Sequence, residues 1–205
     1  MRLILASASP RREALLRQIG LRFEVAPSRA EERVPEGLPP RDLVERLAME
    51  KARLVAAGRT RGLVIGADTV VVLDGRILGK PAGPDDAREM LRRLSGREHQ
   101  VTTGIAVVDA ATGESRRDSV TTTVTFAPLS EETIARYVST GEPLDKAGAY
   151  AIQGYGALLI EGISGCYYNV VGLPLRRLAE LLCELGYDAF EEATRRRAAR
   201  ARRAG

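Results

Sequence analysis

The stretch Leu63-Val-Ile-Gly-Ala-Asp-Thr-Val-Val-Val-Leu73 decides the fold. Eight of its eleven residues are apolar, several are β-branched, and the pair Asp74-Gly75 follows directly. A short apolar run of this composition that ends at a turn signal predicts a buried strand leading into a hairpin. The run nevertheless carries Asp68 and Thr69 at its centre. Because an uncompensated buried carboxylate costs several kcal/mol, we expect a cation or hydrogen-bond donors beside Asp68.

Two interpretations of Asp68 remain open at this point. Buried acids with perturbed surroundings cluster at functional sites, which favours an Asp68 that acts on a bound ligand. The alternative is a strand end at which Asp68 caps a neighbouring backbone group. The rest of the chain has to supply the partners that decide between them.

The remaining pattern predicts alternating strands and helices, and therefore an α/β fold with a mixed sheet. Ser9, Pro10 and Gly20 predict the two ends of the first helix, as N-cap, first helical residue and C-terminal stop. The expected strands are residues 3–6, 23–26, 63–73, 76–81, 99–109, 120–126, 158–161 and 167–171, and the expected helices are residues 10–19, 41–57, 84–94, 131–139 and 174–185.

Composition excludes several classes of protein. The chain has 205 residues, of which 44% are hydrophobic, and no apolar run long enough to cross a bilayer, so we expect a cytoplasmic protein with no membrane contact. The single histidine, His99, excludes a histidine-cluster metal site and leaves carboxylates to bind a hard cation such as Mg²⁺. We expect Cys166 and Cys183 to be buried small side chains rather than a disulfide.

The net charge of +4 comes from the end of the chain. Residues 191–205 carry six arginines and two glutamates, which leaves 25 basic and 25 acidic residues before them. We expect one catalytic domain over residues 1–190, followed by a tail that is disordered or a frayed helix. A solubilising end explains such a tail better than nucleic-acid binding does.

Two basic groups indicate a site for an anion. Ser7-Ala-Ser-Pro-Arg-Arg12 lies between a strand and a helix N-terminus, which offers backbone N–H groups and the positive end of the helix dipole. Arg11 and Arg12 are unfavourable in a first helical turn unless they face an anionic ligand. Lys51 follows Leu47 by four residues and falls on or beside the apolar stripe of its helix, together with Leu43 and Leu54. It either extends to solvent or reaches a phosphate.

Common catalytic motifs are missing from the sequence. Gly79-Lys80-Pro81 lacks the spacing and hydroxyl of a P-loop, and Gly154-Tyr-Gly156 lacks the third glycine of a dinucleotide fingerprint. With one histidine and no G-x-S-x-G motif, Ser-His-Asp hydrolysis is also excluded. The remaining Arg, Lys, Glu and Asp residues suit a polyphosphate bound with Mg²⁺.

An ordered set of motifs resembles the Maf (septum-formation) family of nucleoside triphosphate pyrophosphatases. The resemblance covers residues 2 to about 186 and implies an elongated mixed sheet flanked by helices, with two lobes around a central cleft. Its motifs are Leu5-Ala-Ser-Ala-Ser-Pro-Arg-Arg12, Leu47-Ala with Lys51-Ala52, Gly66-Ala-Asp-Thr-Val70, Gly79-Lys-Pro81, Leu94-Ser-Gly96, Asp145-Lys-Ala-Gly-Ala-Tyr150, Ile152-Gln-Gly154 and Val171-Gly-Leu-Pro174.

The resemblance also implies roles for particular residues. Asp68 would be the proton acceptor, and Asp68 with Glu32 would hold a divalent cation, Mg²⁺ or Mn²⁺. Glu31 stands beside Glu32 and competes for that assignment. The phosphate-binding and supporting residues would be Ser7, Arg11, Arg12, Lys51 and Lys80.

The same resemblance implies a substrate and an assembly. Arg11, Thr69 and Gln153 match the branch that acts on dTTP and UTP, and the amide of Gln153 offers the donor and the acceptor that a uracil or thymine edge requires. A homodimer is the expected assembly. The sequence leaves open whether Asp68 is a base or a metal ligand. It also leaves open a nucleotide-sensing regulator without turnover, and a nucleic-acid-associated protein that acts through its tail.

Overall fold

The computed structural model describes residues 1–28 and 37–195. One seven-stranded sheet organises them, in the order β2-β1-β3-β5-β6-β7 with β4 also paired to β3. β1 runs parallel to β2 and β3, whereas the remaining pairs are antiparallel. This mixed sheet confirms the predicted α/β class. The strands are β1 (Leu3–Leu5), β2 (Phe23–Val25), β3 (Leu63–Leu73), β4 (Arg76–Leu78), β5 (Glu98–Asp109), β6 (Ser115–Phe126) and β7 (Ile160–Ser164).

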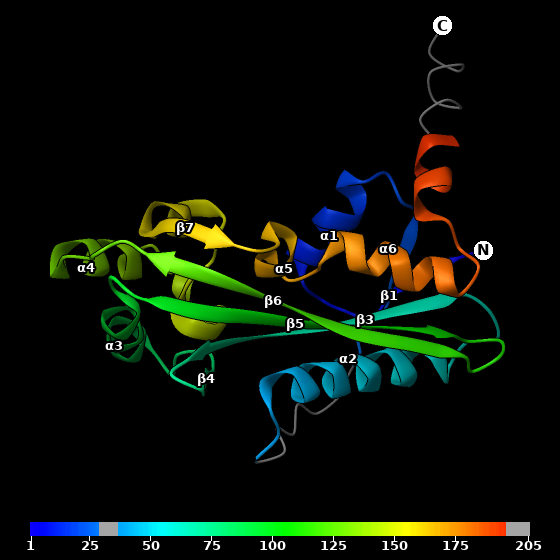
Figure 1. The fold of residues 1–205 in the computed structure, drawn as a ribbon, viewed down its shortest axis with the longest axis horizontal. Helices are drawn as coiled ribbons and strands as arrows, with labels where there is room; N and C mark the ends of the chain where they lie inside the picture. Colours follow the sequence, from blue (N-terminus) through cyan, green and yellow to red (C-terminus); the bar gives the residue numbers. More distant parts are fainter. Residues whose placement is uncertain (29–36, 196–205) are drawn as a thin grey trace, which may run out of the picture.

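Helices cover both faces of the sheet (Figure 1). α2 (Pro40–Ala56) lies along one face, while α1 (Pro10–Gln18), α5 (Tyr167–Val171) and α6 (Leu175–Glu184) lie on the other. α3 (Pro84–Leu94) and α4 (Glu131–Ser139) stand at the far end of the long strands. Three 3₁₀ turns join the remaining elements, namely Glu142–Asp145, Ala147–Ala149 and Gly154–Leu159.

The turn residues Asp74 and Gly75 determine the hairpin that follows β3. Asp74 and Gly75 have φ angles of 52° and 75°, and two positive φ angles are what a two-residue hairpin turn of the favoured type requires. β4 then pairs back on the last three residues of β3. The predicted strand and hairpin are therefore confirmed.

Two glycines bring α2 into contact with the backbone of the sheet. A Cβ on Gly66 of β3 would lie 2.1 Å from the carbonyl oxygen of Ala48, and one on Gly104 of β5 would lie 2.3 Å from that of Val44. Only a residue without a side chain fits at such distances. The helix consequently packs closely on the strand that carries Asp68.

Apolar side chains gather into two large clusters toward opposite ends of the sheet. One joins α1 and α6 to the first half of β3, with Leu16, Ile65 and Leu182 fully buried. The other joins α3 and α4 to the second half of β3, and includes Phe126 and Tyr150. His99 lies beside this second cluster, 3% exposed, with its ring edge-on to Phe126 and Tyr150.

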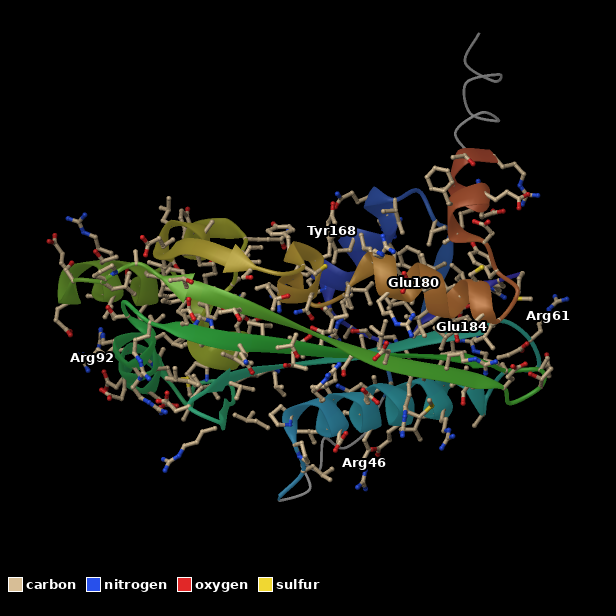
Figure 2. All side chains as sticks on the ribbon, viewed as in Figure 1. Arg46, Arg61, Arg92, Tyr168, Glu180 and Glu184 are labelled. Atoms are coloured by element: carbon tan, nitrogen blue, oxygen red, sulfur yellow. The ribbon has the colours of Figure 1, made fainter. Side chains whose placement is uncertain are left out.

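Charged side chains line the outside of the molecule. Figure 2 shows Arg46 projecting from the outer side of α2 and Arg92 from the end formed by α3. Arg92 pairs with Glu131 of α4, and Glu184 of α6 pairs with Arg116 of β6.

Within residues 1–28 and 37–195, no helix is long and apolar enough to cross a membrane.

Several sequence-based predictions were wrong in detail. Residues 167–171 form α5 rather than a strand, although Tyr and Val favour strands, because a helical turn places Asn169 against the sheet, where its amide is fully buried and hydrogen-bonded. The strand expected at 158–161 begins later, as β7. Leu54, expected on the apolar face of α2, is 52% exposed.

The cysteines also differ from expectation. Cys166 is half-buried and Cys183 is exposed, so neither is the buried side chain expected, and both are free.

The first residues of the arginine-rich tail are helical. Residues 191–195 continue a helix in which Ala193 packs on the cluster around α1 and α6. Residues 196–205 lie outside the described part of the chain.

The contact at Gly66 predicts a large effect of one added methyl group. Gly66→Ala should lower the free energy of unfolding by about 2–3 kcal/mol, because α2 has to move off the sheet. Gly162→Ala is the control, since a Cβ on that β7 glycine meets nothing within 4 Å, and its effect should stay within about 0.5 kcal/mol. Urea denaturation of the two variants provides the comparison, and equal effects would show that the packing is not tight.

Burial of His99 predicts a loss of stability in acid. Burial lowers the pKa of His99 from 6.5 to about 4, so the unfolded chain binds a proton between these pH values and the folded chain does not. Stability should therefore fall as the pH decreases from 6.5 to 4, by about 3 kcal/mol in total.

His99→Gln retains a partner for the hydroxyl group of Tyr150 and removes the titration. The free energy of unfolding, measured by urea denaturation from pH 4 to pH 8, should decline less steeply in this variant than in the parent protein. Parallel pH profiles for the two proteins would contradict the assignment to His99.

Candidate active site

A gap in the sheet surrounds Asp68. On one edge of β3, β1 pairs with Leu63–Ile65 and β4 pairs with Val71–Leu73. Residues 66–70 therefore have no strand neighbour on that edge in the described part of the chain, whereas β5 pairs with residues 63–72 on the opposite edge. The chain leaves β1 toward α1 and leaves β4 toward Lys80 at this same place. In open α/β sheets, ligands bind where neighbouring strands diverge.

A cleft of about 670 Å³ occupies the gap. Its charged lining comprises five cations and two acids, so the cleft suits a polyanion such as a polyphosphate. These side chains are Arg11, Arg12, Lys51, Lys80, Lys146, Asp68 and Asp145.

Asp68 lies on the side of the strand that faces α2. Its Oδ1 is 2.6 Å from Nζ of Lys51, whose side chain is buried. The cation expected beside Asp68 is therefore present. The position of Lys51 on the buried stripe of its helix is also confirmed, and its ammonium points to the cleft instead of extending to solvent.

Thr69 points to the opposite side of the strand, where Arg12 joins three segments. The guanidinium donates to Oγ of Ser7 at 3.1 Å, to Oγ1 of Thr69 at 3.1 Å, and to the carbonyl oxygen of Gly172 at 2.8 Å. Arg12 thus fixes the segment before α1 against β3 and the end of α5. A lysine has no such fork of donors.

The start of α1 contributes to the same cleft. Ser9 is the N-cap and Pro10 the first helical residue, as predicted, although the side chain of Ser9 makes no capping hydrogen bond. The backbone N–H of Ser9 instead donates to Oγ of Ser7 at 3.2 Å. Both residues line the cleft, so the positive end of the helix faces it.

Arg11 and Lys80 enter the cleft from two sides of the gap. Neither makes an ion pair within residues 1–28 and 37–195. Lys146 differs, because its Nζ is 2.6 Å from Oδ1 of Asp145. The hydrogen bond from Lys146 and the nearby charge of Arg11 both lower the pKa of Asp145, so Arg11 is attracted to that carboxylate as well as to an anionic ligand. The charge of Lys80 is available to the ligand.

Gln153 does not belong to the lining of the cleft. Gln153 is exposed and lies outside the lining, although the preceding residue, Ile152, belongs to it. The turn after Gln153 is held by Glu142, whose carboxylate accepts hydrogen bonds from the N–H groups of Tyr155 and Gly156, both at 3.0 Å. Burial opposes ionisation of Glu142, but these donors keep its pKa below the usual value. Glu31 and Glu32 lie outside the described residues.

The donor set is compatible with a divalent cation that also binds substrate. Residues 1–28 and 37–195 contain no group of three or more His, Cys, Asp or Glu side chains suited to hold a metal alone. Oδ2 of Asp68 makes no hydrogen bond in this part of the chain. Because Mg²⁺ is commonly held by one or two carboxylates together with substrate phosphates, Asp68 fits that arrangement.

Sequence reasoning missed two kinds of site residue. Thr103 and Asn169 lie behind the cleft and belong to no motif, so the sequence carried no signal for them. Lys146 and Tyr150 line the cleft, and their small-residue segment was recognised as suited to close approach of a ligand, but without roles for individual side chains.

The sheet has a gap between β1 and β4, and a cleft rich in cations lies in this gap at the N-terminus of α1. This arrangement is typical of proteins that bind phosphorylated ligands. The model of the family described as Maf-like protein matches residues 2–185. The chain belongs to this family.

Relatives named dTTP/UTP pyrophosphatase are similar over nearly the whole chain. The protein of Moorella thermoacetica is 57% identical over 92% of this chain and 97% of its own length. That of Pelotomaculum thermopropionicum is 53% identical over 92% and 98%, and that of Clostridioides difficile is 53% identical over 89% and 94%. Among solved structures, the Ham1 protein of Staphylococcus aureus has a TM-score of 0.48 and 16% identity, over 78% of this chain and 80% of that one.

Proposed function

We propose that this protein hydrolyses dTTP and UTP to the nucleoside monophosphate and pyrophosphate. The observation that carries the proposal is the ion pair of Asp68 and Lys51 in the gap of the sheet, inside a cleft that has five cations in its lining. The names of the relatives described above supply the substrates.

The cations of the cleft have different roles in binding the triphosphate. Arg11 and Lys80 neutralise phosphate charge, including the charge that accumulates on departing pyrophosphate. Arg12 hydrogen-bonds to Ser7 and Thr69 and so holds both hydroxyl groups in place beside the start of α1. The phosphates therefore bind to a preorganised site. Lys51 pairs with the carboxylate of Asp68 and orients it inside a mostly apolar strand.

Asp68 is the group placed to act on water. Its carboxylate orients a water molecule and accepts its proton as that water attacks the α-phosphorus. The bond from the α-phosphorus to the bridging oxygen then breaks, and pyrophosphate leaves with the electron pair. The residues that would hold a divalent cation, Mg²⁺ or Mn²⁺, beside the substrate phosphates are Glu32 or, in place of its role toward water, Asp68. The cation would supply charge neutralisation at the phosphates.

Base choice is assigned to Arg11, Thr69 and Gln153. Arg11 and Thr69 line the cleft. The exposed position of Gln153, next to Ile152 of the lining, suits contact with a base at the opening of the cleft. The amide of Gln153 offers both a donor and an acceptor to a uracil or thymine edge.

The setting of the reaction follows from the same proposal. The protein works in the cytoplasm, where its nucleotide substrates are made, and it does so as a homodimer. Large apolar side chains exposed at and beside the edge strand β7, including Tyr155 at 63% and Leu158 at 82%, offer a face for a second copy.

The assay that tests the function separates the two possible phosphate products. Purified protein with Mg²⁺ should release pyrophosphate from dTTP and UTP, and should act much more slowly on CTP, ATP and GTP. Orthophosphate in place of pyrophosphate would refute the assignment of the cleaved bond. Binding of UTP without any turnover would instead identify a nucleotide-sensing regulator.

Removal of one charge tests the role of Asp68. Asp68→Asn should lower kcat by a factor of about 100 or more, because the base or metal-ligand charge is lost, while circular dichroism shows a retained fold. Asp74→Asn is the control, since it removes the same charge at the exposed turn that follows the same strand. Turnover of Asp68→Asn close to that of the control would make Asp68 structural.

A further inference from the structure

A row of hydrogen-bonded groups runs from the cleft into the core behind it. Nη2 of Arg12 donates to Oγ1 of Thr69, which lies 2.9 Å from Oγ1 of Thr103. Oγ1 of Thr103 lies 2.9 Å from the backbone carbonyl oxygen of Asn169. Thr69 lines the cleft, whereas Thr103 and Asn169 are fully buried and do not.

The contacts of Asn169 fix the far end of this row. Its Oδ1 accepts from the backbone N–H of Thr103 at 3.1 Å, and its Nδ2 donates to the backbone carbonyl of Val101 at 2.9 Å. The N–H of Thr103 can only donate and the carbonyl of Val101 can only accept, so the oxygen and nitrogen of the Asn169 amide have one possible placement. Nδ2 also donates to Oγ1 of Thr122 at 2.9 Å, which ties α5 to the sheet.

The direction of every hydrogen bond in the row follows from counting protons. A threonine hydroxyl has one proton, and a carbonyl oxygen can only accept. Thr103 therefore donates its proton to the carbonyl of Asn169 and can only accept from Thr69. Thr69 in turn donates to Thr103. Toward Arg12 and toward the cleft, Thr69 has only lone pairs.

We propose that Thr103 is a positioning residue that fixes Thr69 as a hydrogen-bond acceptor toward the bound nucleotide. The inference rests on the proposed function, and it deepens the recognition step. Thr69 then favours a substrate group that donates a proton. dTTP and UTP share one group that can only donate, the N3–H of the base. The ring N3 of cytosine carries a lone pair instead, so it would face Thr69 with no proton between them.

Replacement of Thr103 by valine tests the proposal with little change of shape. In Thr103→Val the proton of Thr69 loses its acceptor and turns toward the cleft, so Thr69 becomes a donor. The ratio of kcat/KM for UTP to that for CTP should therefore fall about tenfold. Thr103→Ser keeps the hydroxyl and should retain the parental ratio.

A purely structural role for Thr103 gives a different result. In that case Thr103→Val lowers kcat/KM for UTP and CTP by one factor and leaves their ratio unchanged, which would overturn the proposal. Thr69→Val supplies an independent test if Thr103→Val does not fold, because it removes the acceptor itself and should lower the ratio of UTP to CTP. Where Thr103→Val does fold, adding it to Thr69→Val should change that ratio no further. An unchanged ratio in Thr69→Val would also overturn the proposal.

A second measurement separates this proposal from the proposed function. If the parent protein binds UTP but releases no pyrophosphate, the function is wrong. Dissociation constants of the α,β-imido analogues of UTP and CTP then report the same preference by calorimetry. A weaker preference for the UTP analogue in Thr103→Val supports the fixed polarity of Thr69, and an unchanged preference contradicts it.

Discussion

The ion pair between Lys51 and Asp68 is the interaction on which the site depends. Asp68 belongs to a strand that is otherwise almost wholly apolar, and its side chain is only 14% exposed. A charge in that position requires a partner, and α2 provides one because Gly66 and Gly104 let the helix lie directly on the backbone of the sheet. The two glycines therefore bring α2 close enough for Lys51 to balance the charge of Asp68.

The gap in the sheet gives one cleft access to both faces of β3. Successive residues of a strand point to opposite sides, so Asp68 faces α2 while Thr69 faces α1 and α5. Since residues 66–70 lack a strand neighbour on one edge, a ligand there reaches both side chains. Under the proposed function, proton transfer falls to Asp68 and recognition to Thr69. The two residues are adjacent but have separate supports, Lys51 on one side and the row from Arg12 to Asn169 on the other.

Local patterns predicted the parts of the site that lie within one element. β3 has the predicted limits, the first helix begins at Pro10, and Lys51 occupies the buried stripe of α2. Contacts between distant segments carry no such signal. Tyr167–Val171 has the composition of a strand and forms a helix, because burial of the Asn169 amide against Val101 and Thr103 outweighs local preference. The hydrogen bonds of Thr103 to Asn169 exist only because of that helix.

A double-mutant cycle on Lys51 and Asp68 tests the central claim most directly. The free energy of unfolding is measured at pH 7 for the parent, Lys51→Met, Asp68→Asn and the double variant. If Lys51 balances the charge of Asp68, Lys51→Met is more harmful alone than in the presence of Asp68→Asn, with a coupling energy of about 1–3 kcal/mol. Strictly additive effects would mean that the carboxylate is stable in the core strand without its lysine, and would contradict the account.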